Sequence, residues 1–253
     1  MKQIPNLFTL LNLCCGFIAI ILILQTGETI LSMQDGTWQI FLPERTAWAA
    51  FFIGLAAVID FLDGFVARLF KATSEMGKQL DSLADVVTFG IAPGLILYQL
   101  LRITFAQEPD GMDTSMIWLL PAMIFPMAAA WRLARFNIDT STREGFEGVP
   151  TPAAGLLIAS FPLLLLYNTY NIQLLLLNKW VLYAIIVVMS WLMVSKLSLL
   201  NLKFKTWGFA ENKARYALLI LAVAGIALLN WLAVPFIFLT YIAVSLLFKN
   251  KTT

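Results

Sequence analysis

Residues Asp60 to Asp85 read DFLDGFVARLFKATSEMGKQLDSLAD and place four aspartates in a largely apolar chain. Asp60 and Asp63 are three residues apart, so on a helix they lie on one face. Asp81 and Asp85 are four residues apart, with the same consequence. Carboxylates in membrane-spanning segments are costly, and they usually face a wet cavity and serve a function. The stretch therefore predicts two acidic helix faces that meet at one site.

The composition shows what kind of chain surrounds this stretch. Hydrophobic residues make up 60% of the 253 residues and charged residues 13%, which is typical of a polytopic membrane protein. The net charge is only +2 and the basic residues are scattered, so we expect no nucleic-acid partner. The chain has no histidine, which excludes histidine-dependent triads and histidine metal sites. Acid–base chemistry therefore falls to carboxylates, lysine, arginine or tyrosine.

Apolar stretches of about bilayer length predict eight membrane-spanning helices in an all-α bundle, a single integral membrane domain over residues 1–253. The predicted spans are residues 7–24, 47–70, 77–101, 116–136, 152–170, 175–194, 214–230 and 231–248. The first resembles a signal peptide, but it is long and lacks a clear cleavage site, so we expect it to be retained. Gly90, Pro93 and Gly94 are expected to bend the third span, and residues 26–44 to form an interfacial loop.

The basic residues predict the orientation of these spans. If the N-terminus is cytoplasmic, 14 of the 17 lysines and arginines fall on the cytoplasmic side. The three on the other side are Arg45, Arg102 and Lys179. By the positive-inside rule, both termini and all four aspartates are therefore expected at the cytoplasmic side of the membrane.

The chemistry of the aspartate stretch points to divalent metal. Four carboxylates brought together repel one another unless a cation neutralises them. Oxygen ligands suit hard cations such as Mg²⁺ or Mn²⁺, and two such ions commonly hold phosphates in a displacement at phosphorus. Gly64, Ala67 and Gly77 would let a bulky ligand approach the backbone, and Arg68 offers a guanidinium group suited to phosphate. These residues predict a metal-dependent site at the cytoplasmic surface of the membrane.

The spacing in this stretch also carries a family resemblance. Asp60-x-x-Asp63-Gly64-x-x-Ala67-Arg68, eight residues, then Gly77-x-x-x-Asp81-x-x-x-Asp85 resembles the full signature of the CDP-alcohol phosphatidyltransferases. These membrane enzymes join an alcohol to a CDP-activated group and release CMP. The resemblance implies that two divalent metal ions, Mg²⁺ or Mn²⁺, are bound by the signature aspartates Asp60, Asp63, Asp81 and Asp85. It implies that Asp85 helps to bind metal or serves as the general base. The CDP pocket would be shaped by Gly64, Ala67, Arg68 and Gly77.

Four further stretches are similar to the bacterial branch of this family that uses serine as acceptor. They are residues 5–12, 85–93, 132–137 and 148–154. This resemblance implies transfer of the phosphatidyl group of CDP-diacylglycerol to L-serine in the bacterial inner membrane. It also implies a homodimer, in which each chain has a six-helix catalytic core followed by two C-terminal helices.

These stretches supply further candidate site residues. Asn6 and Thr9 are candidates for CDP-lipid binding, although helix packing through hydrogen bonds explains them equally well. The candidates for binding the acceptor or a phosphate are Arg132, Arg135, Thr88 and Asn137. For the two arginines, anchoring of the helix end at the membrane surface is the alternative.

Three other readings remain open at this stage. Glycerol 3-phosphate, inositol phosphate or choline could replace serine as the acceptor. Membrane prenyltransferases also use aspartate-rich helices, but they usually carry a third aspartate at the position of Ala67. A divalent-cation transporter would place its acidic residues near the bilayer midplane on several helices, whereas here they cluster at one predicted membrane edge.

Overall fold

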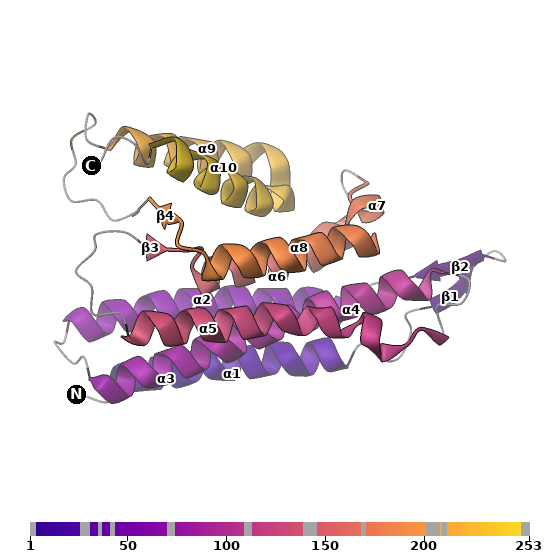
Figure 1. Ribbon diagram of the computed structural model, residues 1–253, viewed down its shortest axis with the longest axis horizontal. Helices are drawn as coiled ribbons and strands as arrows, with labels where there is room; N and C mark the ends of the chain where they lie inside the picture. The colour runs from indigo at the N-terminus through magenta and orange to yellow at the C-terminus, as the bar shows by residue number, and fades with distance from the viewer. Residues whose placement is uncertain are drawn as a thin grey trace.

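The computed structural model describes residues 4–25, 31–34, 37–40, 44–69, 74–108, 113–138, 146–167, 171–200, 208 and 212–248. Within these residues the chain is an all-α bundle with two small antiparallel sheets (Figure 1). The helices of its first half are α1 (Ile4–Leu24), α2 (Glu44–Leu69), α3 (Glu75–Asp85), the π-helical η1 (Val86–Ile91), α4 (Ala92–Ala106), the 3₁₀ segments η3 (Met116–Trp118) and η4 (Leu120–Met123), and α5 (Ile124–Ile138). Those of its second half are α6 (Thr151–Tyr167), α7 (Gln173–Leu176), α8 (Lys179–Val194), α9 (Lys213–Leu229), the 3₁₀ segment η5 (Asn230–Leu232) and α10 (Ala233–Phe248).

The apolar helices confirm the prediction of a polytopic membrane bundle. Four continuous helical segments are long and apolar enough to cross a bilayer, and a fifth such segment, residues 213–247, folds into the α9–α10 hairpin. The shorter apolar helices α6 and α8 complete the set. Many large hydrophobic side chains lie exposed on the helices, for example Phe61, Val188 and Leu239. In a bilayer this surface would contact lipid and not water.

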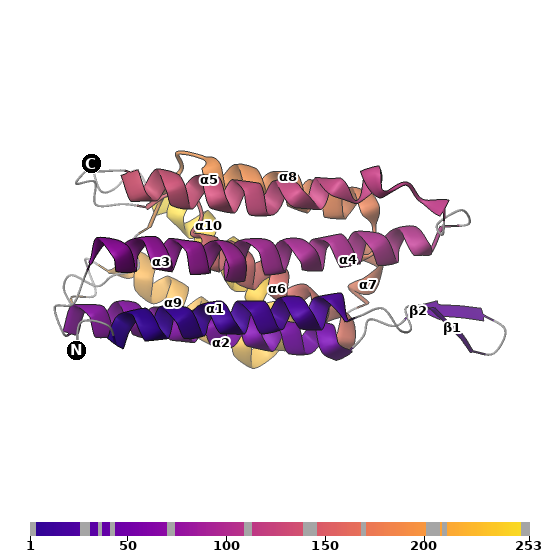
Figure 2. The same ribbon diagram turned by 90° about the horizontal axis from the view of Figure 1, so that it is seen from below.

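The continuous helix formed by α3, η1 and α4 lies at the centre of the bundle. In the apolar stretch of this helix 67% of the residues are buried, whereas in that of the α9–α10 hairpin 17% are buried. The π-helical η1, at the middle of this long helix, contacts α1, α5 and α6. Phe89 within η1 is fully buried. The third predicted span is therefore the element around which the others pack, as Figure 2 shows from below.

The irregularity expected near Gly90 and Pro93 takes the form of a π-helical turn. Pro93 has no backbone N–H, so it cannot donate to the Phe89 carbonyl, which lies four residues earlier. Ala92 instead donates its N–H to the Val87 carbonyl, five residues back. Such single π turns occur mostly within longer α-helices and often at functional sites.

Gly155 of α6 packs directly against this π turn, which leads to a first prediction. A Cβ at Gly155 would lie 2.8 Å from the Phe89 carbonyl oxygen and 3.0 Å from the Phe89 Cα. We expect Gly155→Ala to destabilise the protein by about 1–3 kcal/mol, the usual cost of overpacking. The matched control is Gly54→Ala in α2, because a Cβ at Gly54 would meet nothing within 4 Å. The measurement is the thermal unfolding midpoint of each variant in detergent. Equal midpoints for the two variants would contradict the prediction.

The interfacial loop predicted at residues 26–44 contains a β-hairpin in its central part. Strands β1 (Leu31–Gln34) and β2 (Thr37–Ile40) pair as an antiparallel hairpin, with Leu31 opposite Ile40. The sequence carries the signal for this hairpin, because an Asp-Gly pair at residues 35–36 stands between two short alternating segments. The second sheet pairs β3 (Phe146–Glu147) with β4 (Ser198–Leu199).

The sixth predicted span, residues 175–194, is interrupted near its start. Asn178 caps α8, and its side-chain oxygen accepts from the backbone N–H of Trp180 at 2.9 Å. The residues before this cap form the separate short helix α7. An asparagine at the N-cap satisfies helix N–H groups that have no other partner, so the membrane-spanning helix begins at Lys179.

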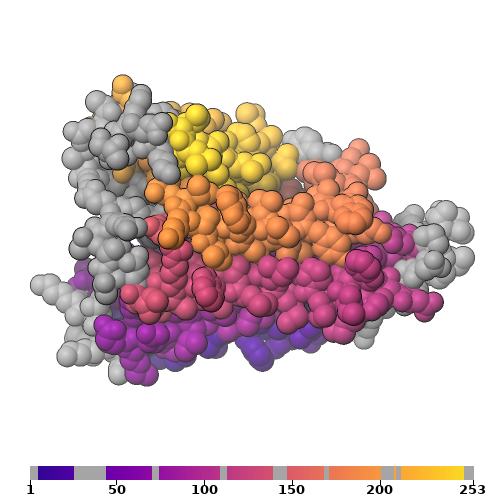
Figure 3. Space-filling view, viewed as in Figure 1, coloured from indigo at the N-terminus to yellow at the C-terminus, as the bar shows by residue number. Residues whose placement is uncertain are grey.

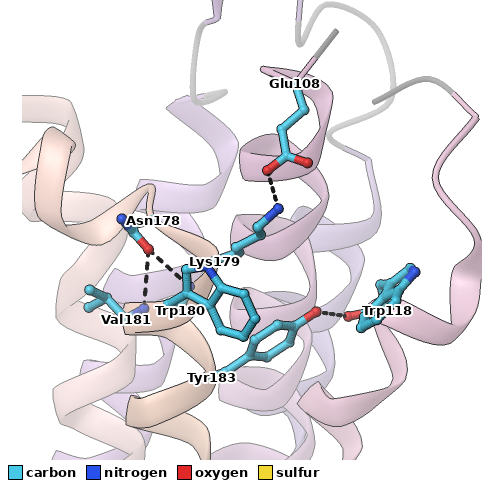
Figure 4. A network of polar contacts seen from close by, with 7 residues as sticks. All are labelled: Glu108, Trp118, Asn178, Lys179, Trp180, Val181 and Tyr183. Carbon is cyan, nitrogen blue, oxygen red and sulfur yellow. Dashed lines mark hydrogen bonds and ion pairs between the residues drawn. The ribbon is translucent and has the colours of Figure 1, made fainter. Parts of the chain in front are cut away.

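The end of the bundle that carries β1, β2 and α7 is held by polar contacts between helices (Figure 4). Lys179 at the start of α8 forms an ion pair with Glu108 at 2.5 Å. The Tyr183 hydroxyl donates to the Trp118 carbonyl oxygen at 2.6 Å. These contacts join α8 to the end of α4 and to η3. Aromatic residues such as Trp118 and Trp180 are common at membrane interfaces.

The elements that carry the acidic stretch meet at the opposite end of the bundle. The start of α1, the end of α2, the start of α3 and the end of α5 all lie at the left in Figure 1, as do β3 and β4. The hairpin of β1 and β2 lies at the right. In the space-filling view of the same side, α8 lies between α5 and the α9–α10 hairpin (Figure 3).

Candidate metal and substrate site

Two helices bring the acidic residues together at this end of the bundle. Asp60 and Asp63 lie on α2, and Asp81 lies on α3. One carboxylate oxygen from each of the three lies within 4.8 Å of the other two. The start of α3 is fixed by Ser74, whose hydroxyl oxygen accepts from the Gly77 N–H at 3.0 Å. The structure therefore brings these three predicted ligands into one cluster.

Asp85 lies one turn further along α3 and deeper in the bundle. Its side chain is only 7% exposed, and its Oδ1 is buried without a hydrogen-bond partner in the described part of the chain. Asp85 interacts electrostatically with Asp60, Asp63 and Asp81. A buried carboxylate oxygen with no donor is costly unless a ligand supplies one. Asp85 thus extends the cluster inward.

Helix α1 supports the cluster through two polar residues. The Thr9 hydroxyl donates to Asp63 Oδ2 at 2.8 Å and is buried. Asn12 is fully buried, and its side chain interacts with Asp85. Thr9 therefore orients a predicted metal ligand. Asn12 was not among the predicted site residues, although its spacing of three residues from Thr9 places it on the same helix face.

A pocket of about 210 Å³ opens beside the carboxylates. It is lined by residues of α1, α2 and α3, namely Pro5, Asn6, Thr9, Asp63, Gly64, Ala67, Ser74, Gly77, Lys78 and Asp81. A Cβ at Gly64 would meet nothing within 4 Å, whereas one at Gly77 would lie 3.1 Å from Asn6 Oδ1. The three small residues of the signature thus line one pocket together with Asn6 and Thr9. Arg68 is exposed in the last turn of α2 and does not belong to this lining.

The two arginines of α5 have different surroundings. Arg132 donates from Nη1 to the Thr151 hydroxyl at 3.1 Å and interacts electrostatically with Asp85. Its Nε is buried and has no hydrogen-bond partner among the described residues. Arg135 pairs through Nη2 with Glu147 at 2.5 Å and donates from Nη1 to the Val194 carbonyl at 3.2 Å.

Thr88 and Asn137 both make contacts between helices. The buried Thr88 hydroxyl donates to the Asn12 carbonyl oxygen at 3.3 Å, which joins η1 to α1. Asn137 donates from its side-chain amide to the Ser82 hydroxyl at 2.8 Å. Its backbone carbonyl accepts from Lys78 Nζ at 3.0 Å. Asn137 therefore ties the end of α5 to α3, next to the acidic cluster.

The donor atoms of this site fit a hard divalent cation. Among the described residues the candidate ligands are carboxylate oxygens, which suit Mg²⁺ and Mn²⁺ better than softer metals. The partnerless Asp85 Oδ1 adds a buried oxygen that a cation would satisfy. The fold and the site together define a polytopic membrane protein with a carboxylate cluster that could hold a divalent cation, beside a pocket at one end of its helices.

Residues 2–192 match the family described as CDP-alcohol phosphatidyltransferase, and the chain belongs to this family. The matched region ends within α8, so the α9–α10 hairpin lies beyond it. The chain is therefore a membrane-bound transferase, as the aspartate signature predicted.

Three curated relatives to which this chain is similar carry the name CDP-diacylglycerol–serine O-phosphatidyltransferase. The one from Bacillus subtilis is 34% identical over 184 residues, which are 71% of this chain and 89% of the relative. The one from Helicobacter pylori is 34% identical over 205 residues, which are 80% of this chain and 74% of the relative. The one from Mycobacterium leprae is 39% identical over 140 residues, 52% of this chain and 43% of the relative.

Proposed function

We propose that the protein transfers the phosphatidyl group of CDP-diacylglycerol to the hydroxyl of L-serine, giving phosphatidylserine and CMP. The observation that carries this proposal is the carboxylate cluster of α2 and α3, with its pocket on one side and Arg132 beside Asp85. The names of the relatives support serine as the acceptor.

The aspartates form the metal-binding part of the proposed site. Asp60, Asp63 and Asp81 would hold two divalent ions, Mg²⁺ or Mn²⁺, and Asp85 would add a further oxygen. When bound, such ions neutralise the charge that develops on the departing CMP. Thr9 holds the Asp63 carboxylate in place through its 2.8 Å hydrogen bond. This contact fixes one ligand before the substrate arrives.

The pocket beside the cluster would take the CDP part of the lipid. Its small residues leave room for the nucleotide, and Lys78 in its lining offers a positive charge to phosphate. The acyl chains need no closed cavity, because they can remain between the apolar outer faces of the helices and the bilayer. Arg68, exposed at the end of α2, would meet a phosphate only outside the pocket lining.

Arg132 and Asp85 would serve the acceptor. A serine carboxylate bound at the Arg132 guanidinium would place the serine hydroxyl near Asp85, since the two side chains interact. Asp85 would take the hydroxyl proton while the serine oxygen forms a bond to the lipid-side phosphorus. The bond from that phosphorus to the oxygen of CMP breaks, and CMP leaves. Arg135 is held by Glu147 and Val194, so we assign the acceptor role to Arg132.

The acceptor assignment is tested with a panel of alcohols. Purified protein is given CDP-diacylglycerol, Mg²⁺ or Mn²⁺, and either serine, glycerol 3-phosphate, inositol phosphate or choline. We expect kcat/KM to be largest for serine. A larger value for glycerol 3-phosphate would contradict the serine assignment and leave the transferase chemistry in place.

The donor pocket leads to a prediction about Gly64. We expect Gly64→Leu to fill the pocket and to lower kcat/KM for CDP-diacylglycerol about 100-fold, because a displaced substrate loses its reactive alignment. The fold should tolerate the change, since a Cβ at Gly64 meets nothing within 4 Å. Gly54→Leu on the same helix is the matched control, because Gly54 is also open but does not line the pocket. Equal activities for these two variants would contradict the pocket assignment.

We further propose that the site faces the cytoplasm of a bacterial inner membrane, with both termini on that side. The distribution of lysine and arginine along the sequence supports this orientation. Both substrates could then reach the site, the lipid from the bilayer and serine from the cytoplasm. Homodimer formation, which the family resemblance implies, stays a prediction.

A further inference from the structure

The last helix, α10, holds the backbone of Leu200 at two points. The Tyr241 hydroxyl donates to the Leu200 carbonyl oxygen at 3.1 Å. The Leu200 N–H donates to the Ser245 hydroxyl oxygen at 3.2 Å. Tyr241 and Ser245 are four residues apart and so lie on one face of α10, and Ser245 is only 2% exposed. Both backbone groups of Leu200 are thus bound by the same helix face.

Leu200 directly follows strand β4, which connects it to the arginines of α5. In the sheet, Glu147 of β3 lies opposite Ser198 of β4. Glu147 is also the ion-pair partner of Arg135. The strand pair therefore links the Leu200 segment to the end of α5.

The turn after β3 continues this connection to Arg132. Gly148 has a φ of +72° and donates its N–H to the Leu197 carbonyl at 2.8 Å. A Cβ at Gly148 would lie 2.5 Å from the Met193 carbonyl oxygen, so this turn is pressed against the end of α8. Three residues later Thr151 begins α6, and its hydroxyl accepts from Arg132.

Tyr241 also lies within electrostatic range of Arg132. Arg132 interacts electrostatically with Asp85 on one helix and with Tyr241 on another. Its Nε is buried with no hydrogen-bond partner in the described segments, so the position of the guanidinium depends on few contacts. A nearby phenol oxygen favours a guanidinium that would otherwise be costly to bury.

We propose that the α9–α10 hairpin (residues 213–248) is a positioning element of the acceptor site, which acts through Tyr241 and Ser245 on Arg132. The hairpin lies beyond the region that matches the family, yet it binds Leu200, which β4, β3 and the Gly148 turn connect to Thr151, the partner of Arg132. The inference rests on the proposed role of Arg132 in binding the acceptor. Neither Tyr241 nor Ser245 needs to touch substrate.

The test is a comparison of Michaelis constants for the purified full-length protein. Tyr241→Phe removes the hydroxyl and keeps the ring. We expect KM for serine to rise about fivefold, the factor that one hydrogen bond contributes. KM for CDP-diacylglycerol and kcat should stay within about twofold, because the carboxylate cluster and the pocket of α1, α2 and α3 are untouched. If Tyr241 only stabilised the fold, Tyr241→Phe would lower kcat/KM for serine and for CDP-diacylglycerol to the same extent.

Two further variants sharpen the comparison. Ser245→Ala should raise KM for serine in the same direction, and it carries the test if Tyr241→Phe fails to fold. Thr240→Val is the matched control on the same helix, since the Thr240 hydroxyl bonds to the backbone oxygens of Phe236 and Ile237 within α10. We expect Thr240→Val to leave both Michaelis constants unchanged.

A double variant shows whether Tyr241 acts through Arg132. In an Arg132→Lys background, Tyr241→Phe should add little further loss, because residues that act as a unit are not additive. An undiminished effect in that background would overturn the inference, as would unchanged kinetics or equal losses for both substrates.

The wild-type protein separates the two proposals. If it accepts a different alcohol in place of serine, the proposed function fails. The same comparison of Michaelis constants, made with the accepted alcohol, then still decides the role of the hairpin.

Discussion

Asp85→Asn is expected to abolish turnover and to leave the binding of CDP-diacylglycerol within about threefold of the wild type. The amide cannot take the serine proton, and loss of a general base costs about 10²–10⁴ in rate. Asn keeps the size of Asp at a position only 7% exposed, so the packing should hold. CMP release measures turnover, and titration with the CDP-lipid in the presence of Mg²⁺ measures binding.

Asp113→Asn is the control for this experiment. Asp113 lines a pocket with Trp118 and Lys179, at the end of the bundle that carries β1, β2 and α7, and its change should leave both quantities unaltered. If Asp85→Asn loses binding as severely as turnover, Asp85 is chiefly a metal ligand, and the base must be sought elsewhere.

Removal of divalent metal is expected to have an equally large effect. A chelator should reduce CMP release to background, and added Mg²⁺ or Mn²⁺ should restore it, because the clustered carboxylates repel one another and the phosphates without a cation. Metal should also raise the thermal unfolding midpoint of the wild type, since a ligand that binds only the folded state stabilises it.

The variant Asp63→Asn provides the matched comparison. This change turns the Asp63 carboxylate, which accepts a hydrogen bond from Thr9, into a neutral amide. An amide binds a cation more weakly, so the metal-dependent shift of the unfolding midpoint should shrink. Activity that persists in chelator, or an equal metal-dependent shift in both proteins, would contradict the metal assignment.

The sequence predicted the bundle and the aspartate cluster because both depend on local regularity. Apolar runs of bilayer length define spans without knowledge of how they pack. The spacing of Asp60, Asp63 and Asp81 defines helix faces in the same way, and the structure brings one oxygen of each within 4.8 Å. Gly64 and Gly77 line the adjacent pocket, because they share those helices.

Features that depend on contacts between distant segments were not predictable in the same way. Arg132 and Arg135 stand three residues apart and look equivalent in the sequence. Only the packed structure shows that Arg135 pairs with Glu147 and that Arg132 interacts with Asp85. The two hydrogen bonds between α10 and Leu200 span sequence separations of 41 and 45 residues. No periodicity in the sequence indicates such contacts.

The form of two local features was not predicted, for a different reason. The Asp-Gly turn signal of the β1–β2 hairpin was present, but the polar character of residues 26–44 suggested a loop. Pro93 was expected to bend its helix. The irregularity there is a π turn, against which Gly155 of α6 packs, and the helix stays continuous.

The most direct test of the central claim is the stoichiometry of the reaction on purified protein. Labelled serine and CDP-diacylglycerol are supplied with Mg²⁺ or Mn²⁺, and CMP and labelled lipid are measured together. The account predicts one phosphatidylserine formed for each CMP released. CMP without labelled lipid, or no CMP with any alcohol, would contradict it.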